Sequence, residues 1–113
     1  MKVLAHHIYE YKKGLRQLIL HTLPAKNRFE AETRLKLAGI NFLTREVSAE
    51  KINIFFGAKE CIEVIKRFGD KPFNEYSPEE DFILGVLLGY DKIQQCNRYL
   101  HFCGRKKIIG KIA

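Results

Sequence analysis

The segment 77–100 constrains the fold of this chain most, because its polar residues mark the ends of helices. Ser77 is followed three residues later by Glu80, the spacing of a capping box, in which each side chain bonds to the other residue's backbone N–H. Gly89 then interrupts the apolar helical pattern, and Asp91 is suited to cap a further helix. The segment therefore predicts two consecutive helices joined by a tight corner at Gly89.

Apolar spacing predicts the remaining elements. Ile52, Ile54 and Phe56 recur at every second position, the period of a strand with one face on a core. The run 15–23 fits either a strand or a continuation of the preceding helix. A strand is favoured, because Gly14 would otherwise lie mid-helix at a cost of about 1 kcal/mol. In chain order we expect a helix at 3–13, a strand at 15–23, a helix at 27–38, strands at 40–47 and 51–56, and helices at 58–68, 77–88 and 91–102.

The expected element order, α-β-α-β-β-α-α-α, predicts an α+β fold. Its three strands form a small, mainly antiparallel sheet, and about five helices gather on one face of that sheet as a two-layer sandwich. We expect residues 1–103 to form a single domain and residues 104–113 to form a basic C-terminal tail. Leu84, Leu87 and Leu88 indicate a further apolar surface, which a homodimer would bury.

The net charge of the chain is +7, and residues 104–113 contain four basic side chains and no acidic one. This balance favours an acidic protein or nucleic acid as partner; the alternative is a solvated surface that only aids solubility. The sequence has no apolar run of the ~20 residues needed to span a bilayer and no signal-peptide pattern. We therefore expect a cytoplasmic protein with no membrane partner. The candidate basic surface consists of Arg16, Lys26, Arg28, Arg34, Lys36, Arg105, Lys106 and Lys107.

His7, Glu10 and Lys59 are the candidates for a polar site. A spacing of three places His7 and Glu10 on one helix face, where they could bind a divalent metal or move a proton. Two ligands, however, leave a transition metal short of the four it usually takes. Lys59 follows Gly57 at a predicted helix start, where backbone N–H groups could hold an anion. The favoured interpretation of each is structural, so we expect no catalytic residue, no metal and no cofactor.

The three cysteines, Cys61, Cys96 and Cys103, lack the spacing of a metal finger or a redox pair. Cys96 and Cys103 share a predicted helix face with Ile93 and Leu100, which indicates a buried core stripe. In a reducing cytosol these cysteines should be free and mostly buried. A metal or redox role is the alternative.

Several blocks of the sequence resemble a bacterial family, the domain of unknown function numbered twenty twenty-three. The resemblance extends to about Leu100 and implies a three-stranded, five-helix domain that is a homodimer. It also implies an association with flavodoxins, which are acidic, and it supplies no catalytic residues. The blocks are His7-Ile8-Tyr9-Glu10, Lys12-Lys13-Gly14-Leu15-Arg16, Thr22, the segment from Ala38-Gly39-Ile40 to Asn53-Ile54-Phe55-Phe56-Gly57, Gly89-Tyr90-Asp91, Gln95-Cys96 and Arg98-Tyr99-Leu100.

These observations predict a non-enzymatic, homodimeric interaction module that serves an acidic electron-transfer protein such as a flavodoxin. Transient docking of that kind needs only a small interface with matched charges. Two alternatives stay open at this point. One is a nucleic-acid-binding protein that uses the same basic surface, and the other is a metal- or cofactor-dependent enzyme that uses His7 and Glu10.

Overall fold

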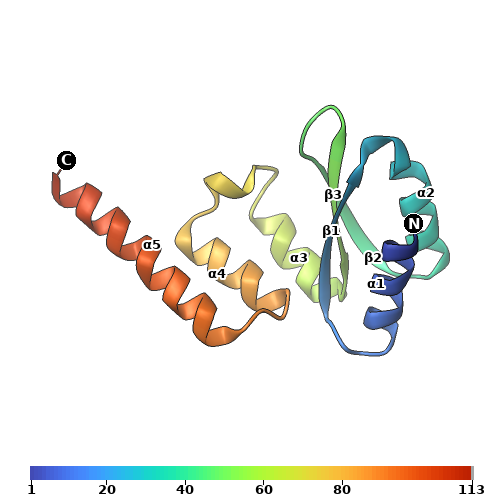
Figure 1. The fold of residues 1–113 in the computed structure, drawn as a ribbon, viewed down its shortest axis with the longest axis horizontal. Coiled ribbons are helices and arrows are strands. Elements are labelled where there is room, and N and C mark those ends of the chain that lie inside the picture. The colour runs from blue at the N-terminus through green and yellow to red at the C-terminus, as the bar shows by residue number, and fades with distance from the viewer. Residues whose placement is uncertain (113) are drawn as a thin grey trace. The chain divides into compact units, whose positions relative to one another are not determined.

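A computed structural model of the chain describes residues 1–112, with side chains for residues 1–104 (Figure 1). The chain divides into two compact units, Met1–Asp70 and Lys71–Ala113. The expectation of a single domain over residues 1–103 stays a prediction. The first unit contains α1 (Lys2–Lys12), β1 (Leu18–Pro24), the 3-10 turn η1 (Ala25–Asn27), α2 (Arg28–Leu37), β2 (Asn41–Glu46), β3 (Lys51–Gly57) and α3 (Lys59–Arg67). The second contains η2 (Phe73–Glu75), α4 (Pro78–Leu87) and α5 (Lys92–Ile112).

The three strands form one antiparallel sheet in the order β1-β3-β2. The central strand β3 pairs with both neighbours, so that Phe56 lies opposite Ile19 on one side and Phe42 on the other. The fold class, the five helices and the element order are thus confirmed. The run 15–23 supplies a strand, as favoured, and Gly14 belongs to the connection before it, with φ of +77°.

One face of the sheet carries the main apolar core, which is covered by α1 and α2 (Figure 1). The alternating Ile52, Ile54 and Phe56 all point to this face, as their period of two predicts. Helix α1 contributes Leu4 and helix α2 contributes Leu35, both fully buried. The complete cluster of buried residues is Leu4, Ile19, Leu23, Ala31, Leu35, Ile40, Ile52, Ile54 and Phe56.

The opposite face of the sheet is covered by α3 (Figure 1). Phe55, which points away from the main core, is only 1% exposed, and α3 buries Cys61, Ile62 and Ile65. The prediction that all helices gather on one face was therefore wrong: the unit Met1–Asp70 has three layers. The reason is that β3 is the central strand and is buried on both faces, so it presents an apolar side chain to each.

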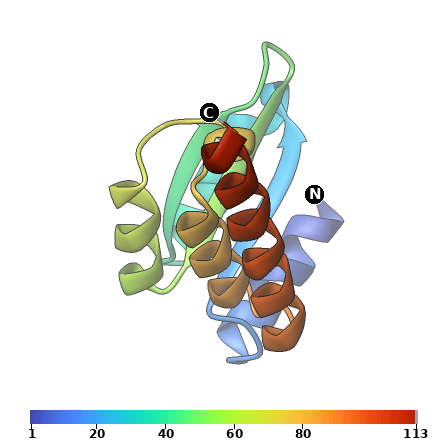
Figure 2. The ribbon, with the colours of Figure 1, turned by 90° about the vertical axis from the view of Figure 1, so that its left-hand side faces the viewer.

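In the second unit, α4 and α5 run side by side (Figure 2). The capping box is present: Glu80 N donates to Ser77 Oγ at 3.1 Å, and Ser77 N donates to Glu80 Oε1 at 2.9 Å. Asp91 caps α5 by accepting from Gln94 N at 2.9 Å. The predicted end of this helix near residue 102 was wrong, because α5 continues to Ile112. Gly104 lies within α5, and a single glycine costs a helix only about 1 kcal/mol.

Candidate functional site

A polar cluster lies where α1 meets the sheet. The carboxylate oxygen Oε1 of Glu10 lies 3.4 Å from His7 Nδ1, 3.5 Å from His6 Nε2 and 4.0 Å from Arg16 Nη1. His21, on β1, places its ring against His7, with 5.2 Å between the ring centroids. The sequence placed His7 and Glu10 on one helix face and offered His21, on a predicted strand, only as a conceivable further ligand. The packing of α1 against β1 brings the His7 and His21 rings together.

The electrostatics of this cluster favour a neutral His21. Burial lowers the pKa of His21, and the charges of His7 and of the chain's N-terminus lower it further. Among the described residues, no group of three or more His, Cys, Asp and Glu side chains is placed to hold a metal ion. Lys59, the first residue of α3, forms no ion pair with any described residue and lies outside this cluster.

Acidic neighbours neutralise part of the candidate basic surface. Arg28 contacts Glu32 at 3.2 Å and Glu46 at 3.8 Å, and Arg34 contacts Glu30 at 3.6 Å. Lys26 and Lys36, in contrast, form no ion pair with any described residue. The side chains of Arg105, Lys106 and Lys107 lie outside the described side chains. In the described part of the chain, lysines therefore supply much of the uncompensated positive charge.

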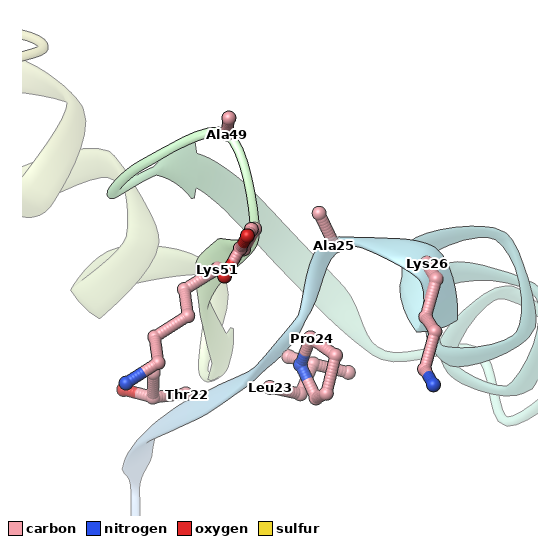
Figure 3. Close-up of a pocket in the computed structure, with 8 residues that line it drawn as sticks. Thr22, Leu23, Pro24, Ala25, Lys26, Ala49 and Lys51 are labelled. Carbon is pink, nitrogen blue, oxygen red and sulfur yellow. The ribbon is translucent and has the colours of Figure 1, made fainter.

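A groove of about 640 Å³ lies at the C-terminal end of β1, beside the turn between β2 and β3 (Figure 3). A backbone hydrogen bond from Ala25 N to Glu50 O, 2.8 Å long, joins its two walls. Figure 3 shows the side chains of Lys26 and Lys51 on either side of Pro24. Lys51 is also without an ion pair among the described residues, so two free ammonium groups border this groove. Its lining residues are Thr22, Leu23, Pro24, Ala25, Lys26, Ala49, Glu50 and Lys51.

A second groove, of about 460 Å³ and mostly apolar, lies between α4 and α5. The stripe of α5 that was predicted to be core points outward: Ile93 is 68% exposed, Leu100 is 64% exposed, and Cys96 is exposed. The core of this helical pair instead uses Leu84 and Leu88, which are buried. The groove is lined by Glu79, Phe82, Ile83, Cys96, Tyr99 and Leu100.

The cysteines are free, as predicted, but the expectation that most of them are buried was wrong. Only Cys61 is buried, whereas Cys96 is exposed and Cys103 is intermediate. Burial, and secondarily the charge of Glu60, raises the pKa of the Cys61 thiol. Cys61 is therefore held in its less reactive, protonated form.

Polar contacts also join α4 and α5, and the pair Tyr99–Glu79 belongs to the lining of the apolar groove. Tyr99 Oη donates to Glu79 Oε2 at 3.0 Å, and Arg98 donates to both oxygens of Asp81, at 2.7 Å and 3.0 Å. Hydrogen bonding to Cys103, and then to Glu79, raises the pKa of Tyr99 to about 12. The Tyr99 hydroxyl is therefore neutral at physiological pH and remains a hydrogen-bond donor at the edge of the groove.

The capping box that starts α4 is reinforced from outside the helix. Lys71 Nζ donates to Glu80 Oε1 at 2.7 Å. This bond, followed by the bond from the Ser77 backbone, lowers the pKa of Glu80. Glu80 therefore stays ionised well into the acidic range and holds the first turn of α4.

The fold and these surfaces define a small, basic α+β protein with a three-stranded sheet and a C-terminal helical pair. The chain belongs to the family described as protein of unknown function (DUF2023), which matches residues 2–102. A search of curated proteins found no match to the chain. Within the described residues, none of the helices combines the length and the apolar character needed to cross a membrane.

Proposed function

We propose that this protein is a non-enzymatic, homodimeric interaction module that binds an acidic protein such as a flavodoxin. The observation that carries the proposal is the apolar groove between α4 and α5, with Leu100 64% exposed at its side. Exposed apolar patches of this kind, surrounded by polar residues, are typical of protein interaction sites. The proposal places the protein in the cytoplasm, where its three free thiols stay reduced.

The apolar groove is the proposed surface of the homodimer. Its lining combines Phe82, Ile83 and Leu100 with the polar pair Tyr99–Glu79 at the edge. An isologous contact would place the same patch on both subunits and bury the exposed side chains of each against the other. A polar rim around an apolar centre is the usual anatomy of such an interface.

The acidic partner is supported by the charge of the chain. The net charge is +7, and the free lysines Lys26, Lys36 and Lys51 are available to an acidic surface because they have no ion pair among the described residues. Flavodoxins are acidic, and the resemblance of the chain to its family implies an association with them. Matched charges of this kind raise the association rate and the specificity of a transient complex more than its affinity.

The homodimer is tested by light scattering on the purified full chain. The wild type should give twice the 13.2 kDa of one chain, and Leu100→Lys should give a monomer because it places a charge in the apolar groove. Leu37→Lys is the matched control, since Leu37 is 84% exposed on α2, and this variant should remain a dimer. A monomeric wild type at tens of micromolar would refute the dimer.

The acidic partner is tested by calorimetric titration with a purified flavodoxin at two salt concentrations. Binding should weaken as the ionic strength rises from about 0.05 M to 0.3 M, because salt screens exposed charges. A parallel titration with a random-sequence oligonucleotide tests the nucleic-acid alternative. Binding to the oligonucleotide without binding to the flavodoxin would reject the proposed partner in favour of that alternative.

A further inference from the structure

The β1 strand presents an unpaired edge. Hydrogen bonds from Ala58 N to Gln17 O and from Ala25 N to Glu50 O lie at the two ends of its pairing with β3. In an antiparallel ladder, residues alternate between bonding to the neighbouring strand and pointing their backbone groups away from it. Gln17 and Ala25 both bond to the β3 side, so the odd-numbered residues between them also face β3. The backbone groups of Leu18, Leu20 and Thr22 therefore point to the free side of β1.

Most of this edge is accessible. Leu18 is fully buried, but Leu20 is half-buried and Thr22 is exposed. No described residue forms a hydrogen bond with the outward backbone groups of Leu20 and Thr22. The open stretch therefore begins at Leu20 and ends at Pro24, which has no N–H and so terminates the row of donors.

The two edges of the sheet differ in charge. The β2 edge carries Arg45 and Glu46, and Glu46 contacts Arg28 at 3.8 Å. Charged residues of this kind protect an edge strand from pairing with another chain. The β1 strand, Leu18–Pro24, has no charged residue. An uncharged, unpaired edge is the place where an added strand is accommodated.

The lysine-bordered groove adjoins this edge. Thr22 and Pro24 belong both to the open edge and to the lining of the groove, whose free ammonium groups come from Lys26 and Lys51 (Figure 3). A strand added beside Thr22 would continue past Pro24 and carry its side chains into the groove. Side chains with carboxylates would then lie near both lysines, in a groove whose lining keeps a net charge of +1 when Glu50 is counted with Lys26 and Lys51.

We propose that the β1 edge and the lysine-bordered groove bind an extended acidic segment of a partner protein as a fourth strand of the sheet. The inference rests on the proposed function for the nature of the partner, and adds the site and the mode of binding. Backbone bonds at Leu20 and Thr22 supply affinity, and Lys26 and Lys51 select carboxylate-bearing side chains. A second copy of this chain is disfavoured here, because its β1 strand has no carboxylate to place beside Lys26 and Lys51.

The probe is a short, capped peptide in which valine and glutamate alternate, added to the full chain. Amide hydrogen exchange measured by NMR should show that the peptide protects the N–H groups of Leu20 and Thr22, which exchange rapidly without it. Two control peptides, one with glutamine in place of glutamate and one N-methylated along one side, should bind more weakly, since each removes one of the two proposed contacts.

Variants of Thr22 separate the backbone contact from the side chain. Thr22→Pro removes the outward N–H, and also the 2.5 Å bond from Thr22 Oγ1 to Asn53 Oδ1; Thr22→Val removes only that bond. Losing one hydrogen bond corresponds to about a fivefold weaker affinity. Thr22→Pro should therefore bind the peptide about fivefold more weakly than Thr22→Val, with both variants shown by circular dichroism to be folded.

Lysine variants test the charge without risk to the fold, because the four side chains involved are exposed. The double variant Lys26→Gln/Lys51→Gln should weaken peptide binding by about fivefold. Lys36→Gln/Lys59→Gln removes the same net charge elsewhere and should leave the affinity nearly unchanged. Equal losses in the two double variants would show that net charge alone attracts the peptide, and would overturn the proposed groove.

Two further results overturn the inference. The first is protection of Leu20 and Thr22 already in the free protein, which would mean that a second copy covers this edge. The second is that the peptide leaves these amides unprotected, either because it binds elsewhere on the protein or because it does not bind at millimolar concentration. The proposed function is decided separately: a flavodoxin that binds the wild type, Thr22→Pro and the Lys26/Lys51 variant equally well leaves that function intact and rejects only this site.

Discussion

Replacement of Gly57 by alanine tests how closely β1 approaches the end of β3. Gly57 has φ of +144°, and a Cβ atom there would lie 2.2 Å from the backbone oxygen of Gln17. The same oxygen accepts the hydrogen bond from Ala58 N at 2.9 Å. A backbone atom cannot move aside as a flexible side chain can, so the added methyl group should force β1 and β3 apart at this point.

The expected cost has two parts. A non-glycine residue in a strained backbone conformation costs about 1–3 kcal/mol, and overpacking a tight contact costs about 1–3 kcal/mol. Gly57→Ala should therefore lower the free energy of unfolding by about 2–6 kcal/mol. A chain of this length has a total free energy of unfolding of roughly 6–17 kcal/mol, at the usual value per residue. The melting temperature should fall by roughly 8–24 °C, at about 4 °C per kcal/mol.

The assay is unfolding of the full chain by urea and by heat, with circular dichroism used to monitor the loss of structure. Gly14→Ala is the matched control: Gly14 also has positive φ, +77°, but a Cβ there meets nothing within 4 Å. This control should cost only the ~1–2 kcal/mol of a left-handed backbone. If Gly57→Ala and Gly14→Ala destabilise the protein equally, the close approach to Gln17 is not what requires glycine at position 57, and the reasoning fails.

Further predictions concern the helical pair and the titrating groups. Gly85→Ala should destabilise α4 by about 1–2 kcal/mol, because its Cβ would clash with the side chain of the buried Gln95. Gly104→Ala should instead stabilise the protein slightly, because a Cβ atom at this position of α5 would meet nothing within 4 Å. Equal urea midpoints for Gly85→Ala and Gly104→Ala would contradict this. The pKa of His21 is lowered in the folded protein, so the contribution of His21 to the free energy of unfolding is present above pH 6.5 and is lost as the pH falls further. The melting temperature should therefore drop on acidification below this value, and the drop should be smaller in His21→Gln but not in the exposed control His101→Gln. The pKa of Glu80 is also lowered in the folded protein, so the contribution of Glu80 to the free energy of unfolding is complete above pH 4.5 and is lost as the pH falls through the folded pKa. Glu80→Gln should therefore lower the stability at pH 7 and flatten the acid limb of the melting curve, and an unchanged acid limb would reject this assignment.

Local sequence determined the parts of the fold that depend on neighbouring residues. The Ser77–Glu80 capping box forms as its spacing predicts, because both bonds join residues within one helical turn. The alternation of Ile52, Ile54 and Phe56 likewise placed one face of β3 on the core. The pairing of His7 with Glu10 also followed from a spacing of three residues.

The tertiary structure alone decided what lies against each face. Periodicity identified Cys96 and Leu100 as sharing a side of α5, but the helical pattern could not show that this side is exposed. Phe55 lies outside the alternation of Ile52, Ile54 and Phe56, yet it is buried because α3 packs on that side of the sheet. The open edge of β1 depends on strand order, which no local pattern encodes. Side-chain period fixes which residues face the same way, whereas burial depends on whether a distant segment of the chain arrives to cover them.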